Sequence, residues 1–244
     1  MATRENKLYK GIVYRLTPIK EKDAMVSCIG QDGLFSFFAR GVMNPTSSDF
    51  AACSVLSQSE FILNVSTQDA LRLKEGTLIK SYRQEPNYSV AMASQGMLEA
   101  LCKALSPEDA SAFYPYVEKG FACIDEGKDP LTVLAIFLAK LLIVSGYGPT
   151  LDQCAECGKK SDIVAFSPSS GGLLCRECAS ELGVEKSPVE LLKAIRAVFL
   201  VPLDKIGSFS ISGAMILPLL STLMVMVEES TGVLLKGVAS LLKY

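Results

Sequence analysis

Two pairs of cysteines have a spacing that is typical of metal binding. The chain holds Cys154-Ala-Glu-Cys157, then seventeen residues, then Cys175-Arg-Glu-Cys178. Each Cys-x-x-Cys turn presents two thiolates to one ion, and Zn²⁺ takes four such soft ligands in a tetrahedron. The spacing belongs to the recognised class of paired Cys-x-x-Cys zinc motifs. It therefore predicts one structural zinc ion per chain, held by Cys154, Cys157, Cys175 and Cys178.

Other uses of these cysteines fit the pattern less well. A thioredoxin-like redox motif occurs once, between a strand and a helix, and would not recur symmetrically. Four cysteine ligands leave no open position for a catalytic zinc. An iron–sulfur cluster on the same four ligands remains an alternative. The other cysteines have apolar neighbours and no common spacing, so we interpret them as core residues: Cys28, Cys53, Cys102 and Cys123.

The 244-residue sequence contains no histidine. That absence removes Ser-His-Asp triads, Cys-His pairs and His-ligated catalytic zinc, as well as the signature of zinc deaminases. The run from Pro168 to Gly172 lacks the lysine and the following helix of a phosphate-binding loop. We therefore expect a protein that is not an enzyme.

Compartment and membrane association also follow from composition. Residues 1–7 are polar and lack the apolar segment of a signal peptide. Eight cysteines without such a signal predict the reducing cytoplasm. The apolar stretch 131–145 is too short to span a membrane and contains Lys140, while 209–227 is diluted by serines, a threonine and Pro218. We interpret both as buried helices and expect no membrane partner.

The first 80 residues predict five short strands. Stretches of β-rich sequence occupy 11–16, 24–29, 34–40, 60–65 and 77–82, and the turn Gly30-Gln31-Asp32-Gly33 predicts a hairpin between the second and third. Five short strands in a segment of this length favour a small closed barrel. An OB-fold is the leading candidate, and an SH3-like barrel fits the strand count nearly as well.

Helical spacing replaces the strand pattern near Pro86. Apolar residues recur helically over 89–105, and Ser106 and Asp129, each followed by proline, predict the starts of two more helices. Ser187-Pro188-Val189-Glu190 predicts another start with a capping box. Final helices are expected over 215–229 and 233–242, with Pro218 in a first turn or at a kink.

The predicted fold class is therefore α+β and multidomain. An N-terminal OB-fold β-barrel over residues 1–82 is followed by the first part of an α-helical domain at 83–150. The four-cysteine zinc module covers 151–186, and the second part of the helical domain covers 187–244.

Several of these segments resemble a known family. Residues 146–158 (GYGPTLDQCAECG), Phe166-Ser167 and residues 171–178 (GGLLCREC) resemble the zinc module of the bacterial recombination mediator RecO family. Residues 9–13 (YKGIV) and 38–41 (FARG) resemble the OB-fold of that family. The order of the modules is similar over nearly the full length.

The resemblance implies a DNA repair and recombination mediator without catalytic chemistry. RecO proteins bind single- and double-stranded DNA and anneal complementary strands. With a RecR-type partner they help to load recombinase onto DNA coated by single-strand-binding protein. The resemblance further implies that the OB-fold is the main DNA-binding element, and a cytoplasmic protein associated with the nucleoid during repair. The alternative is a zinc-ribbon scaffold or transcription-associated factor without annealing activity.

Cations of the first 80 residues are the candidate DNA contacts. OB-type grooves pair cations with phosphates and stack aromatic rings on bases, at about 1–3 kcal/mol per stacked base. The candidates are Lys7, Lys10, Arg15, Lys20, Lys22, Arg40, Lys74 and Lys80. On a strand, Phe35 and Phe37 share one face and Phe38 takes the other, and we interpret at least one of these faces as barrel core. We therefore favour Arg40 and the Lys20/Lys22 turn over any phenylalanine.

The basic excess of this region is small. Residues 1–80 hold 10 Lys and Arg against 8 Asp and Glu. Residues 42–50, a stretch that is typically rich in Lys and Arg in the resembling family, contain no positive charge. Each lost phosphate contact lowers the salt dependence of binding by roughly one unit. The sequence therefore predicts weaker DNA binding than in a strongly basic relative, with recruitment relying on protein partners.

Overall fold

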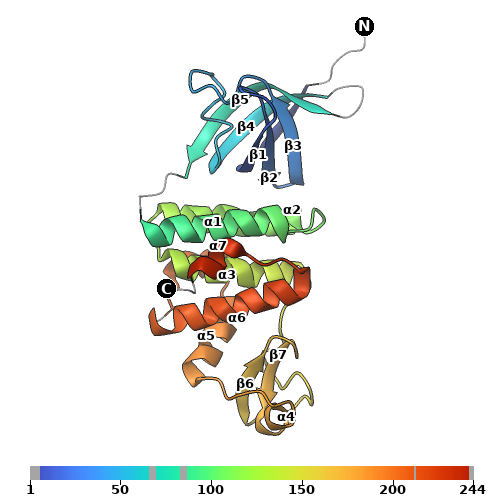
Figure 1. Ribbon diagram of the computed structural model, residues 1–244, viewed down its shortest axis with the longest axis vertical. Helices are drawn as coiled ribbons and strands as arrows, with labels where there is room; N and C mark the ends of the chain where they lie inside the picture. Colours follow the sequence, from blue (N-terminus) through green and yellow to red (C-terminus); the bar gives the residue numbers. More distant parts are fainter. Residues whose placement is uncertain (1–5, 66–69, 83–86, 212, 242–244) are drawn as a thin grey trace. The chain divides into compact units, whose positions relative to one another are not determined.

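A computed structural model describes residues 6–65, 70–82, 87–211 and 213–241 (Figure 1). The chain forms two compact units. One unit comprises residues 1–85 and 106–125, and the other comprises residues 86–105 and 126–244. The first contains a β-barrel and one helix, and the second contains the other helices and the cysteine region.

Five strands close into a barrel in the order β1-β2-β3-β5-β4. They are β1 (Asn6–Pro18), β2 (Ala24–Gly30), β3 (Gly33–Ala39), β4 (Ser57–Val65) and β5 (Leu71–Ser81). β1 pairs with both β2 and β4, and the β3–β5 pair is parallel where the other pairs are antiparallel. The five N-terminal strands are thus confirmed. β1 begins earlier than predicted because its residues 6–10 pair with residues 60–64 of β4.

Alternation along the strands builds the barrel core. Val26 and Cys28 on β2 and Phe37 on β3 are fully buried, and the Phe37 ring lies 4.8 Å from that of Phe61 on β4. The predicted hairpin is present, with Gly30 paired to Gly33, whose φ is +109°. That left-handed φ suits glycine, which has no Cβ to clash.

Residues 41–56, between β3 and β4, form a series of turns rather than a helix or strand. Val42, Ala52 and Cys53 of this segment are buried in the barrel core. Asp49 Oδ1 accepts a hydrogen bond of 2.8 Å from the Gly76 amide on β5. The segment therefore packs into the barrel through its apolar residues and is fastened to β5 by a carboxylate.

Helix α2 (Ala110–Asp125) packs on β2 and β3 within the first unit. Gln58 of β4 donates hydrogen bonds to Tyr114 Oη at 3.3 Å and to Glu118 Oε1 at 2.5 Å, while the Tyr82 hydroxyl donates to Gln58 Oε1 at 3.2 Å. These contacts group α2 with the barrel, whereas the predicted boundaries assign it to the helical domain at 83–150.

The second unit is organised around helix α3 (Pro130–Val144). It packs against α1 (Tyr88–Lys103), α5 (Val189–Leu200) and α6 (Gly213–Thr231), and also contacts the 3-10 turn Leu203–Ser208. A short helix α7 (Lys236–Leu241) packs on α1 and α6. Residues 132–142 of α3 are buried all round. This explains why the helix is apolar on every face.

Lys140 is the charged residue within that buried stretch of α3. Its ammonium donates a 2.7 Å hydrogen bond to the carbonyl of Phe199 at the end of α5. Carbonyls of the last helical turn lack partners within their own helix and attract cations. Burial lowers the pKa of Lys140 from its ordinary value.

Helix starts were predicted with mixed success. Asp129 caps α3 by accepting a 3.0 Å hydrogen bond from the Thr132 amide, which confirms the predicted start. The capping box at Ser187 is wrong, because Pro188 is the N-cap of α5 and the Ser187 hydroxyl accepts from the Phe166 amide instead. Pro218 lies inside α6, which begins at Gly213. Pro86 and Leu242 lie outside the described residues.

Helix α6 is long and apolar enough to cross a membrane by length and composition, with 39% of its apolar window buried. It packs against α3, α5 and α7. Core helices of globular proteins share these properties, so this single helix does not indicate a membrane protein.

Candidate metal centre and nucleic-acid interface

The four paired cysteines lie on a small β-hairpin module of the second unit. β6 (Ile163–Ser167) pairs with β7 (Gly172–Cys175), and the short helix α4 (Arg176–Glu181) follows directly. Cys154 and Cys157 lie on a tight turn, in which the Gly158 amide donates to the Cys154 carbonyl at 2.9 Å. Gly158 has φ +74°, which permits this turn without steric cost. Cys175 ends β7, and Cys178 lies in the first turn of α4.

The sulfurs of these cysteines converge on one point. All four Sγ atoms lie within 4.8 Å of one another, and the Cys157 and Cys175 sulfurs are 3.7 Å apart. Tetrahedral coordination with Zn–S bonds of about 2.3 Å separates neighbouring sulfurs by about 3.8 Å. Cys154, Cys175 and Cys178 are buried and Cys157 is exposed. The cluster can therefore hold one metal ion, and its geometry fits a tetrahedral one.

Hydrogen bonds within this cluster shift the pKa values of its thiols. Burial raises the pKa of the Cys154 thiol, but amide hydrogen bonds from Cys175, Cys157 and Glu156 outweigh it and lower the pKa to about 6. The pKa of Cys178 is raised, chiefly by its hydrogen bond with Cys157 and also by burial. The raised pKa of Cys178 favours its protonated thiol. Metal binding must then release protons.

Two ion pairs join the segments of the module at its surface. Arg176 donates from Nε and Nη2 to the two carboxylate oxygens of Asp162, at 3.0 and 2.9 Å. Lys159 Nζ lies 3.2 Å from Glu177. The pairs link the chain around the first cysteine turn and β6 to α4. Surface ion pairs therefore hold the module together in addition to its sulfur cluster.

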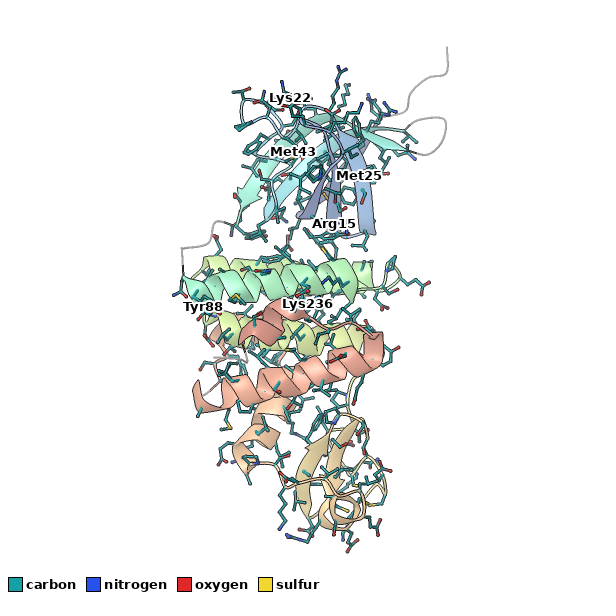
Figure 2. The ribbon with its side chains drawn as sticks, in the orientation of Figure 1. Arg15, Lys22, Met25, Met43, Tyr88 and Lys236 are labelled. Atoms are coloured by element: carbon teal, nitrogen blue, oxygen red, sulfur yellow. The ribbon has the colours of Figure 1, made fainter. Side chains whose placement is uncertain are left out.

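On the barrel, one outer face combines aromatic, thioether and cationic side chains. Met25 on β2 pairs with Phe38 on β3, and Phe38 pairs in turn with Arg72 on β5. The Arg72 guanidinium lies 5.8 Å from the centre of the Phe38 ring, a cation–π distance. Arg15 on β1 is exposed opposite Ser27 of β2 (Figure 2). We call Met25, Phe38 and Arg72 the β2–β3–β5 face.

The predicted DNA-contact cations fall into different settings. Lys20 and Lys22 are exposed in the turn between β1 and β2, Arg40 is exposed directly after β3, and Lys74 is exposed on β5. Lys7 and Lys10 are exposed on the first half of β1. Lys80 instead pairs with Asp125 of α2 at 3.1 Å and lies over the Tyr82 ring. Its charge is already committed within the first unit.

The predicted contacts include neither Met25 nor Arg72 of the β2–β3–β5 face, and they favour the cations over Phe38. The structure buries Phe37 and packs Phe35 against the core, leaving Phe38 half-buried outside it. Strand alternation predicts that Phe38 lies on the opposite face from Phe35 and Phe37. The pairing of Phe38 with Arg72 could not be predicted, because it arises between strands that are distant in the sequence.

Comparisons with known proteins place the chain in a family. The family described as "Recombination protein O C terminal" matches residues 89–237, more than half of the chain. The DNA repair protein RecO of Listeria monocytogenes serotype 4b is 29% identical over 207 residues, covering 83% of this chain and 80% of the relative. The RecO of Bacillus mycoides is 28% identical over 233 residues, covering 93% of each chain. This chain therefore belongs to the RecO family of DNA repair and recombination proteins.

Proposed function

We propose that this chain is a recombination mediator that binds and anneals single-stranded DNA through its barrel, and that it is not an enzyme. It would act with a RecR-type partner on DNA coated by single-strand-binding protein, in the cytoplasm. The observation that carries this proposal is the β2–β3–β5 face. There an aromatic ring, a guanidinium and a thioether are adjacent on the outside of the barrel.

The barrel is proposed to be an OB-fold. Its order β1-β2-β3-β5-β4, closed by the β1–β4 pair, supports this assignment, as does the core-packed segment between β3 and β4. OB-folds bind oligonucleotides on the face of strands 2 and 3 and on the loop between strands 1 and 2. In this chain that face carries Met25 and Phe38, and that loop carries Lys20 and Lys22.

These residues suit a single strand chemically. A base stacked on Phe38 would gain about 1–3 kcal/mol without regard to sequence, as annealing of any complementary pair requires. Arg72 would serve both the ring and a neighbouring phosphate. Arg15, Arg40 and the Lys20/Lys22 turn would follow the backbone, while Lys80 is committed to Asp125. DNA contact is therefore proposed for part of the predicted cation set and for Phe38 and Arg72.

The metal is proposed to be a structural zinc ion, one per chain. Four thiolates fill a tetrahedral sphere and leave no site for water or substrate. The proposed division of labour is a DNA-binding barrel, a helical domain and a zinc module that stabilises that domain. A zinc-ribbon scaffold without annealing activity would use the same module as a contact surface. The β2–β3–β5 face favours the mediator.

Fluorescence anisotropy with a labelled oligo-dT tests the DNA-binding face. Six exposed cations lie on or near it: Arg15, Lys20, Lys22, Arg40, Arg72 and Lys74. At about 0.7 per phosphate contact on a single strand, log K should fall with log salt with a slope of about −4 or shallower. Phe38→Ala should weaken binding about tenfold without changing that slope, because loss of one stacking contact costs about 1–3 kcal/mol.

Arg72→Gln should weaken binding and also reduce the slope by about 0.7. Lys205→Gln is the matched control, since Lys205 is an exposed cation of the second unit that pairs with its neighbour Asp204. Unchanged DNA binding in both Phe38→Ala and Arg72→Gln would contradict the assignment of the β2–β3–β5 face as the DNA-binding face.

A further inference from the structure

A second feature of the first unit is a cavity of about 490 Å³ between the strands and α2. Its walls come from the first half of β1, the β2–β3 turn and the α2 residues Tyr114 and Glu118. Ligand pockets in proteins have volumes of about 300–1,000 Å³. Met25, Phe38 and Arg72 do not line the cavity. The cavity is therefore large enough for a ligand and separate in its residues from the proposed DNA face.

One wall of the cavity is aromatic and closely fitted. The rings of Tyr9 and Phe35 lie 5.1 Å apart. A Cβ on Gly11 would lie 2.9 Å from the Phe35 ring, and a Cβ on Gly30 would lie 2.3 Å from the Lys10 carbonyl oxygen. Both glycines are thus required for this packing. Tyr9 and Phe35 both line the cavity, and the faces of aromatic rings attract cations.

The charges of the cavity are mainly negative. Asp32, Glu60 and Glu118 line it together with the cation Lys10. Within the described part of the chain, none of the three carboxylates forms an ion pair. Glu118 accepts hydrogen bonds from the neutral groups of Gln58 and Tyr114, and both reach Oε1. Among the residues that the structure describes, none donates a hydrogen bond to the second oxygen of this half-buried carboxylate.

We propose that this cavity binds the guanidinium group of an arginine on a partner polypeptide. A guanidinium is planar, donates from a rigid fork to carboxylates and stacks on aromatic faces, which matches the two kinds of wall. Phosphate is disfavoured by the three carboxylates, so DNA is not the occupant. The strands would then carry a protein-docking cavity and a DNA face on different residues. This proposal stands independently of DNA annealing.

An NMR titration of the labelled full chain tests the proposal. The probe is the peptide acetyl-Gly-Arg-Gly-amide, and its citrulline analogue is the neutral isosteric control. We expect saturable shifts centred on the amides of Gly30, Gly33 and Phe35, with a Kd on the order of millimolar for so small a ligand. The citrulline peptide should bind at least tenfold more weakly.

Substitutions of single carboxylates distinguish binding of the arginine peptide in the cavity from nonspecific electrostatic binding. Glu60→Gln should weaken binding of the arginine peptide several-fold without affecting folding, since Glu60 is exposed and has no ion pair in the described residues. Glu118→Gln should weaken it further, and Glu228→Gln, on an exposed part of α6, should have no effect. Equal binding of the citrulline peptide, or shifts that Glu60→Gln leaves unchanged, would overturn the proposal. Tighter binding of spermidine in the same cavity would also overturn it, in favour of a small free cation.

Discussion

At the scale of single residues, the paired cysteines were fully readable from the sequence. Ligand spacing is a local property, since each Cys-x-x-Cys turn forms from neighbouring residues, and the structure brings all four sulfurs together. What the sequence did not indicate is how differently the thiols titrate. That difference depends on the amides that point at Cys154, and these are set by the fold of the turn.

Cys154→Ser should remove bound zinc and destabilise the helical domain. A structural zinc site contributes its binding energy directly to folding, so metal content should fall from about one per chain to near zero and the melting temperature should drop. Metal analysis and thermal unfolding on the same sample give the result. Cys102→Ser, outside the cluster, is the matched control and should keep its zinc. An unchanged melting temperature in Cys154→Ser would argue against a structural metal.

The phenylalanines of β3 show what the sequence pattern of a single strand can and cannot predict. Alternation correctly separated Phe38 from Phe35 and Phe37, because side chains on a strand point to alternate faces. It did not indicate which of the two faces was core. That choice depends on Phe61 and Leu63 of β4, which pack with Phe37 inside the barrel.

At the scale of elements, α2 is held on the barrel by a buried polar network. Gln58 accepts from Tyr82 and donates to Tyr114 and Glu118. Burial, followed by the nearby Glu118 carboxylate, raises the pKa of Tyr82 above its usual value. The Tyr82 hydroxyl therefore keeps its proton in the folded state. Its stabilising effect is fully present below about pH 10, the usual pKa of an unfolded tyrosine, and is lost as the pH rises further, because only the unfolded state ionises there.

Tyr82→Phe should lower the free energy of unfolding by about 0.5–1.5 kcal/mol at about pH 7, the usual net worth of one hydrogen bond. Urea denaturation followed by circular dichroism measures this difference. Tyr88→Phe is the control, because the Tyr88 side chain is exposed. If the two variants unfolded alike, the network would not contribute to the docking of α2.

A second contact between elements, which joins α1 to α7, depends on the ionised carboxylate of Glu99. Glu99 of α1 accepts a 2.8 Å hydrogen bond from the Gly237 amide at the start of α7, and Lys103 lies 2.6 Å away. Burial opposes ionisation of Glu99, but the Lys103 and Gly237 hydrogen bonds prevail and lower its pKa from the ordinary value of a glutamate. The contribution of a lowered pKa is present above the unfolded value and is lost as the pH falls through the folded value.

Glu99→Gln should destabilise the chain by about 1–3 kcal/mol at about pH 7, since it weakens a charge-assisted hydrogen bond. The difference between the variant and the unsubstituted chain should shrink as the pH falls through the lowered pKa of Glu99. Denaturant unfolding at several pH values tests this, with Glu228→Gln on exposed α6 as the control. A difference that stays constant with pH would contradict the assigned role of the Glu99 carboxylate.

Element boundaries were predictable where the signal was local. Asp129 followed by proline marked α3 correctly, because its carboxylate needs only the amide of Thr132. The same reasoning failed at Ser187, whose hydroxyl is taken by Phe166 of β6. A cap candidate can satisfy a distant backbone group instead, and the sequence contains no signal for that choice.

At the scale of the whole molecule, the order of the modules was predictable but the grouping was not. Strand and helix patterns indicated the barrel, the helices and the cysteine module in their observed order. Residues 106–125 group with the barrel, where α2 packs on β2 and β3 and where Gln58 bonds to partners on α2 that lie 56 and 60 positions away. Such pairings are set by the tertiary fold and produce no periodic pattern in the sequence.

The most direct test of the account is strand annealing by the purified chain, on complementary strands coated with single-strand-binding protein. Zinc content is measured on the same sample. We predict annealing with about one zinc per chain, and a large loss of annealing in a Phe38→Ala/Arg72→Gln variant that keeps its zinc and its melting temperature. Absence of DNA binding and annealing in a chain that still holds zinc would contradict the mediator and leave a zinc-bearing scaffold.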